Sequence, residues 1–214
     1  AHRGYFPVAE LATFRRLGTR LQGHPTTAEG LPGVRVASGS LGQGLSVAVG
    51  VAQAKKLAND NHLVYVLMGD GEQEEGQIWE AAMYAPAKNV DNIVAIVDYN
   101  KKQIDGPTDD VLSLGDLRAK YESFGWKVWE CNGNDMQELV DTFNKIRENA
   151  HKGQSQILLA HTEMGMGVDF MMGTHKWHGV APNDEQAANA LSQLKETLGD
   201  YLFQKQIIMD FTGQ

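Results

Sequence analysis

The sequence predicts an α/β fold: a mainly parallel sheet with helices on both faces. Two short apolar runs, 63–68 and 93–97, are continuous and rich in β-branched residues, as in strands covered on both faces. Between them, residues 75–88 have helical composition with the apolar residues roughly on one stripe, which completes a βαβ unit. The 214 residues, 42% hydrophobic and 21% charged, suit a globular domain.

The rest of the chain continues this alternation. Further strands are expected at 126–131 and 156–161, separated by a helix over 135–150 that Asn134 or Asp135 could cap. No internal repeat, Pro/Ser-rich linker or charge block divides the chain, so the sequence predicts one domain over residues 1–214.

Three more helices and one long loop are predicted. A helix-like stretch covers 8–21, and residues 43–59, rich in Ala and Val, predict a helix that is mostly buried under the sheet. The Gly- and Met-rich segment 164–179 is too long for an idle turn, and a polar helix over 183–198 follows it. Because the sequence starts at Ala1 and enters a helix-like stretch directly, we expect that a segment is missing upstream.

Composition excludes several classes of protein. The formal charge of −8 and the pI near 5.3 offer no basic surface, so nucleic acid is not an expected partner. No apolar run approaches the roughly 18 residues that cross a bilayer, and no signal-peptide core opens the chain. Cys131 is the single cysteine and is expected in the core, which suits a reducing compartment. The sequence therefore predicts a cytoplasmic protein with no membrane partner.

The tripeptide Gly69-Asp70-Gly71 directly follows the first predicted strand. Ligands of open parallel sheets bind outside the carboxyl ends of the strands, so this is where a site is expected. Glycines let the backbone approach a phosphate closely, and a carboxylate can hold a cation that bridges to it. Alone, such a tripeptide is more often a plain turn.

A second group of oxygens follows the next strand. Adjacent parallel strands lie about 4.8 Å apart, which brings the Asn100 amide and the Lys102 carbonyl within reach of a metal held by Asp70. Mg²⁺ prefers six oxygens and takes several from phosphate and water. Three protein oxygens plus a diphosphate therefore predict a Mg²⁺–diphosphate site.

These residues resemble the thiamine diphosphate fingerprint, and four segments together resemble transketolases. They are Gly39-Ser-Leu-Gly-Gln-Gly44, Gly69-Asp-Gly-Glu-Gln-Glu-Glu75, Asn100 with Ile104-Asp-Gly106, and Gly173-Thr-His-Lys-Trp-His178-Gly. The resemblance runs from about 21 to 198. It implies a thiamine diphosphate-binding (PP-domain) fold and the N-terminal subunit of a split, two-chain transketolase, which transfers two-carbon ketol units between sugar phosphates.

The resemblance also implies roles for individual residues. It assigns the metal, Mg²⁺, to Asp70, Asn100 and the Lys102 carbonyl; the cofactor to Gly39, Leu41, Gly69, Asp70, Gly71, Asn100, Ile104 and His178; and catalysis to His24, His178, Glu75 and Glu80. In this family the two glutamates link the two active sites of a dimer. An imidazole can donate to phosphate or move a hydroxyl proton near neutral pH.

The chain departs from the family in what it lacks. The leading segment with further histidines has no counterpart, and the pyrimidine-binding domain that carries the thiamine-activating glutamate is absent. Ser40 also replaces a common proline. The resemblance therefore implies a pyrimidine-binding partner subunit, an oligomer, and no activity for the isolated chain.

Several other interpretations stay open. The chain could be a non-catalytic remnant of the domain, part of a 2-oxoacid dehydrogenase, or a deoxyxylulose phosphate synthase. Nicotinamide dependence is disfavoured, because Val47 breaks the GxGxxG pattern and the run precedes the first clear strand. Zinc at His175 and His178 lacks a supporting motif.

Overall fold

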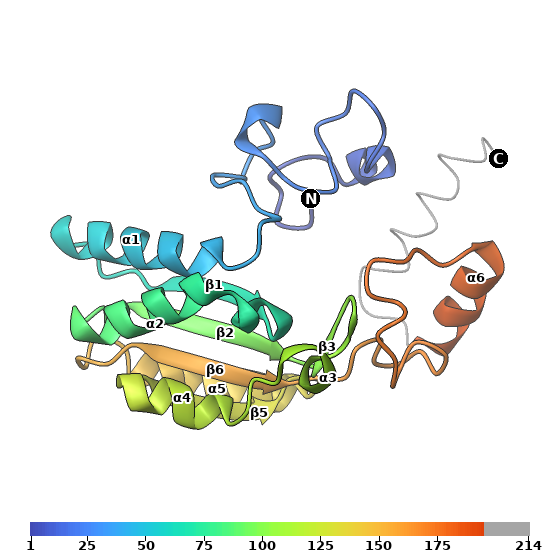
Figure 1. Ribbon diagram of the computed structural model, residues 1–214. Coiled ribbons are helices and arrows are strands. Elements are labelled where there is room, and N and C mark those ends of the chain that lie inside the picture. The colour runs from blue at the N-terminus through green and yellow to red at the C-terminus, as the bar shows by residue number, and fades with distance from the viewer. Residues whose placement is uncertain (195–214) are drawn as a thin grey trace. The chain divides into compact units, whose positions relative to one another are not determined.

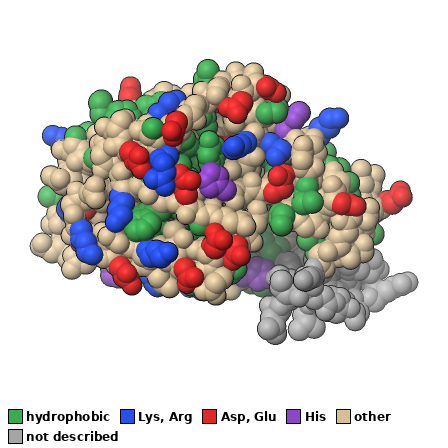
Figure 2. Space-filling model, turned by 90° about the horizontal axis from the view of Figure 1, so that it is seen from below, with side chains coloured by type: hydrophobic (Ala, Val, Ile, Leu, Met, Phe, Trp, Pro, Cys, Tyr) green, Lys and Arg blue, Asp and Glu red, His purple; other side chains and the backbone are tan. Residues whose placement is uncertain are grey.

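The computed structural model describes residues 1–194, in which two compact units are Ala1–Ser40 with Leu194, and Leu41–Gln193 (Figure 1). The larger unit has the predicted α/β fold, and the prediction of one domain over the whole chain stays a prediction. No helix within the described residues is long and apolar enough to cross a membrane. Acidic and basic side chains are interspersed over the face shown in Figure 2.

Four parallel strands form the main sheet in the order β1-β2-β6-β5, seen one below the other in Figure 1. Their bounds are Val64–Gly69 (β1), Ile93–Tyr99 (β2), Lys127–Asn132 (β5) and Gln156–His161 (β6). Gly69 is level with Asp98, and Asp98 with Ala160, so the carboxyl ends of three strands meet at one edge. All four strands were predicted to within two residues.

The helices and a small hairpin connect these strands. The helices are Gln43–Leu57 (α1), Gly76–Ala87 (α2), Thr108–Leu112 (α3), Leu117–Phe124 (α4), Met136–Glu148 (α5) and Asp184–Gln193 (α6), and the hairpin pairs Lys102–Gln103 (β3) with Gly106–Pro107 (β4). Asp135 caps α5 by accepting the Gln137 and Glu138 N–H groups, at 2.8 and 3.0 Å. The last part of the predicted helix 183–198 lies outside the described residues.

Hydrophobic clusters cover both faces of the sheet. On one face, α1, α2 and α4 pack against the strands through residues such as Leu45, Ile78 and Tyr121. On the other, α5 contributes Ile146 to a cluster that includes the buried Cys131, as expected for a small core residue. Burial of these apolar side chains is the main term that stabilises the fold.

The predicted helix over 8–21 is wrong. Only a 3-10 helix, Val8–Thr13, forms there, and the chain leaves helical geometry at Arg15 and Gly18, whose φ angles are +59° and +77°. The Thr13 hydroxyl donates to the Glu10 carbonyl, and the Thr19 hydroxyl to those of Thr13 and Arg16. Such local side-chain bonds compete with the helical ladder.

The prediction that 43–59 is mostly buried holds for only one side of α1. Leu45, Ala48, Val49 and Ala52 are buried, while the opposite side leaves apolar residues exposed, Val51 at 42% and Leu57 at 87%. The helix rests on β1 and α2 with one face only. An apolar helix face that stays uncovered in a single chain is typical of a contact surface.

Helix α4 was missed, although its ends carry recognisable signals. The Asp116 carboxylate accepts the Ala119 N–H at 2.9 Å, as an N-cap does, and Gly125 ends the helix with φ +98°. Leu117 and Tyr121, four positions apart, are its buried side. The helix matters for the site because the Tyr121 hydroxyl reaches Gln73, in the turn after β1.

Candidate functional site

The Asp70 carboxylate lies buried where β1 ends, with its residue only 1% exposed. Its Oδ1 accepts the Gly71 N–H at 2.8 Å, and its Oδ2 accepts the Lys101 N–H from the end of β2. Burial, with a smaller contribution from Asp98, raises the pKa of Asp70 above its ordinary value, against the effect of these two N–H groups. Within residues 1–194 it forms no ion pair, so the carboxylate lacks a compensating cation.

The turn 100–102 stands beside Asp70. The Lys102 N–H donates to the Asn100 Oδ1 at 2.9 Å, and Lys101 between them is left-handed with φ +62°. The Lys101 N–H bond to Asp70 therefore brings all three predicted metal-ligating residues into one cluster. No three His, Cys, Asp or Glu in the described part of the chain form a metal site, so a cation here depends on amide and carbonyl oxygens as well as the one carboxylate. Such an oxygen set suits Mg²⁺.

Gly71 is restricted by its neighbour on the hairpin. A Cβ at this position would lie 2.9 Å from the Gln103 Cβ, which real structures essentially never show. Gln103 is fixed in turn, because its Nε2 donates to the Glu74 carboxylate at 2.8 and 2.9 Å. The turn leads into a short 3-10 segment, Gly71–Glu74, and α2 begins only at Gly76.

Two buried or half-buried side chains that the sequence analysis missed hold this turn in place. The Glu72 carboxylate accepts the N–H of Gly69 at 3.1 Å and that of Gly42 at 2.8 Å, which ties the loop before α1 to the turn. Gln73 is fully buried; its Nε2 donates to the Gly69 carbonyl at 3.0 Å and its Oε1 accepts the Tyr121 hydroxyl at 2.5 Å. No spacing rule reveals such contacts, because partners such as Gly42 and Tyr121 lie far away in the sequence.

We expect Tyr121→Phe to lower the free energy of unfolding by about 1–3 kcal/mol, because the buried Gln73 Oε1 then loses its donor. Urea denaturation measures this change. Tyr84→Phe is the matched control: its hydroxyl pairs with Gln53 on an exposed surface, so its effect should stay within about 0.5 kcal/mol. Equal losses in the two variants would contradict the role of Gln73.

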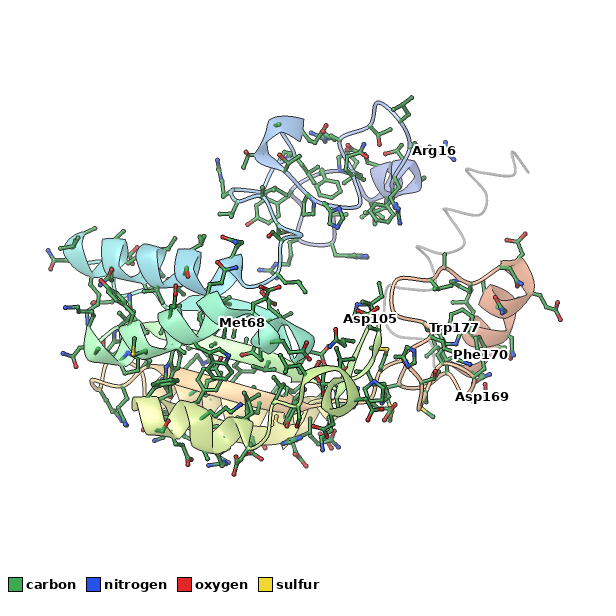
Figure 3. The ribbon with its side chains drawn as sticks, viewed as in Figure 1. Arg16, Met68, Asp105, Asp169, Phe170 and Trp177 are labelled. Atoms are coloured by element: carbon green, nitrogen blue, oxygen red, sulfur yellow. The ribbon has the colours of Figure 1, made fainter. Side chains whose placement is uncertain are left out.

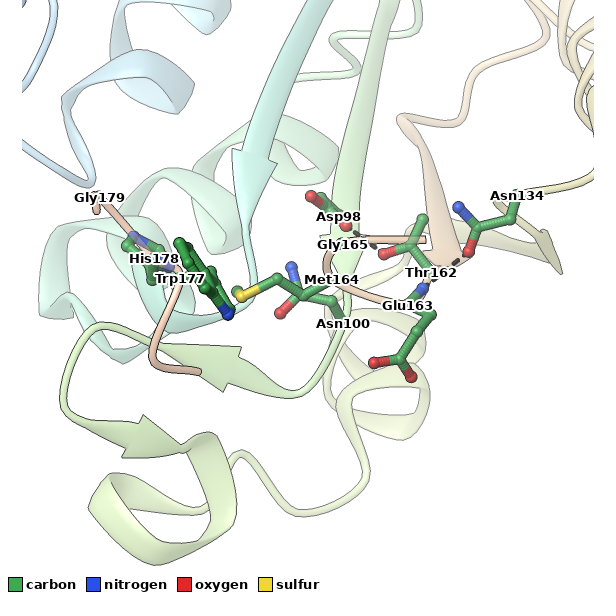
Figure 4. Close-up of a pocket in the computed structure, with 10 residues that line it drawn as sticks. All are labelled: Asp98, Asn100, Asn134, Thr162, Glu163, Met164, Gly165, Trp177, His178 and Gly179. Carbon is green, nitrogen blue, oxygen red and sulfur yellow. Dashed lines mark hydrogen bonds between the residues drawn. The ribbon is translucent and has the colours of Figure 1, made fainter. Parts of the chain in front are cut away.

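A pocket of about 470 Å³ opens beyond the carboxyl ends of β2, β5 and β6 (Figure 4). It is lined by Asp98, Asn100, Asn134, Thr162, Glu163, Met164, Gly165, Trp177, His178 and Gly179. The structure thus brings the predicted residues Asn100 and His178 to one cavity. The lining is rich in carboxylate, amide and hydroxyl groups, which can bind the hydroxyls of a polar ligand.

The loop that carries His178 has its own internal contacts. Trp177 donates its Nε1–H to the Phe170 carbonyl at 2.9 Å, and the two rings meet edge to face at 5.3 Å (Figure 3). The His178 N–H donates to the His175 carbonyl at 2.9 Å. In the described residues the His178 ring forms no hydrogen bond, which leaves its two nitrogens available to a ligand.

The remaining predicted residues lie elsewhere. Leu41 is exposed and its carbonyl accepts the Gln77 Nε2–H at 3.2 Å. Ile104, 63% exposed, lies at the tip of the β3–β4 hairpin beside Asp105 (Figure 3). Glu75 is the exposed residue before α2, and Glu80 lines a separate hollow of about 320 Å³ between α1 and α2. Neither glutamate lines the pocket of His178.

Two predicted residues belong to the unit Ala1–Ser40. Within it, His24 and Gly39 are neighbours: a Cβ at Gly39 would lie 2.5 Å from the His24 Cδ2, and Gly39 has a φ of +125°. Glycine is therefore required at position 39 for the imidazole to occupy its place.

Comparison with known proteins places this geometry in context. The family described as "Transketolase, thiamine diphosphate binding domain" matches residues 3–210. One of the two subunits of the apulose-4-phosphate transketolase of Phocaeicola vulgatus is 42% identical over 196 residues, which cover 92% of this chain and 68% of that protein. The 6-deoxy-6-sulfo-D-fructose transketolase subunit SqwG of Clostridium sp. is 37% identical, with 92% and 70% covered.

Solved structures agree in fold. The transketolase of Campylobacter jejuni superposes with a TM-score of 0.79 at 30% identity, covering 87% of this chain and 30% of that one. The transketolase from Leishmania mexicana gives a TM-score of 0.80 at 29% identity, with 94% and 32% covered. The chain thus spans about a third of the length of these solved transketolases.

Proposed function

The chain belongs to the transketolase family through its thiamine diphosphate-binding domain, and from this premise we propose that it is the diphosphate-binding subunit of a split, two-chain transketolase. In this proposal it holds thiamine diphosphate through Mg²⁺ and, with a pyrimidine-binding partner subunit, transfers two-carbon ketol units between sugar phosphates. The observation that carries the proposal is the buried Asp70 carboxylate, which has no cation of its own within residues 1–194 and is joined to the turn of Asn100 and Lys102.

The residues present fit the cofactor and its metal. Asp70 supplies the negative charge, while the Asn100 amide and the Lys102 carbonyl supply neutral oxygens. Gly71 carries no side chain, and Gln103 leaves no room for one, so the backbone there can approach a diphosphate closely. The chemistry that a bound thiamine diphosphate supplies is a nucleophilic carbon for breaking and forming carbon–carbon bonds.

The chain's own residues orient the sugar and move protons. We assign His178 to proton transfer at a substrate hydroxyl, because the residue lines the pocket and its ring nitrogens form no hydrogen bond in the described part of the chain. Asp98, Asn134 and Thr162 line the same pocket and can bind further hydroxyls. His24, beside Gly39, is assigned to the same task on the family resemblance.

The substrate class follows from the relatives only in broad terms. One relative is named for apulose 4-phosphate and another for 6-deoxy-6-sulfo-D-fructose, and their identities to this chain, 42% and 37%, are close. Both names describe anionic sugars. We therefore propose sugar phosphates as the substrate class and assign no single sugar.

A partner subunit is proposed for two reasons. Three of the relatives are named as one subunit of a transketolase, and the outer sides of α1 and α2 expose apolar residues near the hollow that Glu80 lines. Val47, Val51 and Met83 are 39%, 42% and 57% exposed there. A surface of this kind is typical of a contact with another chain, and Glu75 and Glu80 would then face that chain.

Replacing Asp70 with alanine tests the proposed site. We expect thiamine diphosphate affinity in the presence of Mg²⁺ to fall by about 30-fold or more, equivalent to about 2 kcal/mol, because the diphosphate meets the protein through the metal. Titration calorimetry with and without Mg²⁺ measures the change. The wild-type chain should bind the cofactor much more tightly with Mg²⁺ than without it.

Asp98→Asn is the matched control for this experiment. Asp98 is level with Gly69 in the sheet, but its carboxylate accepts the Thr162 hydroxyl and is not assigned to the metal. Its replacement should change the Mg²⁺ dependence less than about threefold. Equal cofactor affinity with and without Mg²⁺, or an Asp70→Ala chain that binds as well as wild type, would refute the site.

A further inference from the structure

Glu163, directly after β6 and Thr162, connects two segments that the proposed function uses separately. Its Oε1 accepts the Lys102 ammonium at 3.2 Å and the Gly173 N–H at 2.8 Å. Lys102 belongs to the turn proposed to hold the metal, while Gly173 begins the segment that leads to His178. One carboxylate oxygen therefore joins the metal turn to the loop of the candidate catalytic histidine.

Both partners of this ion pair are held in place. The Lys102 side chain is only 16% exposed, and its ammonium also donates to the Asn100 carbonyl at 3.5 Å. The backbone of Glu163 is fixed because its N–H donates to the Asn134 Oδ1 at 2.7 Å, and the preceding Thr162 N–H donates to the Tyr99 carbonyl at 3.4 Å. An ion pair between restrained groups loses less side-chain entropy than an ordinary surface pair.

The loop end of the link is held more weakly. A Cβ at Gly173 would meet no atom within 4 Å, and its φ of +73° marks a sharp change of direction. Close to it in the loop, Met172 and Lys176 differ in burial, but Met172 is 39% exposed. The Glu163 bond is thus a restraint that ties this part of the loop back to the sheet.

We propose that Glu163 is a positioning residue that couples the metal turn 100–102 to the loop 164–179 and so sets where His178 stands in the pocket. This inference rests on the proposed function for the identity of the ligand that binds the turn. A metal that fixes the turn also fixes the Lys102 side chain, which holds Glu163 and, through it, Gly173. Because such coupling is reciprocal, ordering of the loop in turn favours metal binding.

The first test needs no ligand. Amide hydrogen exchange of residues 171–177 is compared in the wild-type chain, Glu163→Ala and Lys102→Met. We expect exchange to be about fivefold faster in both variants, the scale of one lost hydrogen bond. Lys102→Met is the decisive variant, since it keeps the backbone carbonyl and does not touch the loop itself. Loop exchange at the wild-type rate in Lys102→Met would overturn the proposal.

A double variant distinguishes one link from two independent effects. If Lys102 and Glu163 act as one link, the chain with both replacements should exchange no faster at 171–177 than the Glu163→Ala chain. Effects that multiply would overturn the proposal. Glu122→Gln is the matched control, since it removes an exposed ion pair with Arg118 at 2.6 Å within α4, and should leave loop exchange unchanged.

The second test adds Mg²⁺ and thiamine diphosphate. In the wild-type chain we expect slower exchange both at 100–103 and at 171–177, and in Glu163→Ala slower exchange at 100–103 alone. Equal slowing of the loop in both chains would overturn the coupling. A wild-type chain that shows no ligand effect at 100–103 would instead contradict the proposed function, while the ligand-free comparison still decides the link.

Discussion

Replacing His178 with alanine is expected to lower the turnover of the chain assembled with its partner by about 10²-fold or more, the scale of general acid–base catalysis. The residue lines the same pocket as Asn100, and its ring forms no hydrogen bond within residues 1–194. Its removal therefore breaks no internal hydrogen bond of the described structure. We expect the affinity for thiamine diphosphate to fall much less, because Asp70 and the turn 100–102 remain.

Steady-state kinetics of ketol transfer, together with cofactor titration, measure this difference. His175→Ala is the matched control: it lies in the same loop, three residues earlier, but does not line the pocket. Its turnover should stay within about threefold of wild type. His24→Ala is expected to behave as His178→Ala does. If both the His24 and His178 variants keep full activity, the two histidines are packing residues and the proton-transfer role is wrong.

The sheet could be predicted from the sequence because its central strands have a local pattern. Runs such as 93–97 are buried on both faces, so every position is apolar and the pattern needs no information from elsewhere in the chain. Residues 8–21 lack such a pattern of burial. There the helical periodicity competes with local hydroxyl bonds of Thr13 and Thr19 and with the left-handed Gly18, and the local bonds prevail.

The metal cluster could also be predicted from the sequence, because it follows from the topology of the sheet. Parallel strands end at one edge, so polar residues that follow two adjacent strands must be close, and Asp70 does reach the Lys101 N–H. The supporting residues could not be predicted. Glu72, Gln73 and Glu163 act on partners 30, 48 and 61 residues away, and a carboxylate or amide next to a motif carries no signal of such a partner.

The exposed side of α1 leads to the second large effect. A helix of the composition Gln-Gly-Leu-Ser-Val-Ala-Val-Gly-Val-Ala is apolar nearly all round, a pattern typical of full burial. In one chain, however, Val47 and Val51 remain exposed. The burial that the sequence predicts is thus incomplete in a single copy, and another chain is the natural means to complete it.

We therefore expect the chain alone to show no measurable ketol transfer, and to gain it when a pyrimidine-binding subunit from the same source is added. The residues that converge in the described structure surround the ends of β1, β2 and β6. None of the sequence-predicted residues is assigned to the aminopyrimidine side of the cofactor, which needs a carboxylate of its own in this chemistry. The contacts on that side of the cofactor must then come from the partner.

Transfer from a ketose phosphate to an aldose phosphate is assayed with the chain alone, with the partner alone and with both. Turnover by the isolated chain would refute a divided active site. A complex that forms and binds thiamine diphosphate but stays inactive would favour a non-catalytic remnant. Val51→Glu separates association from chemistry: a charge on the exposed side of α1 should weaken complex formation about tenfold or more, yet leave Mg²⁺-dependent cofactor binding by the free chain unchanged. Loss of activity without loss of association in that variant would place the partner elsewhere on the chain.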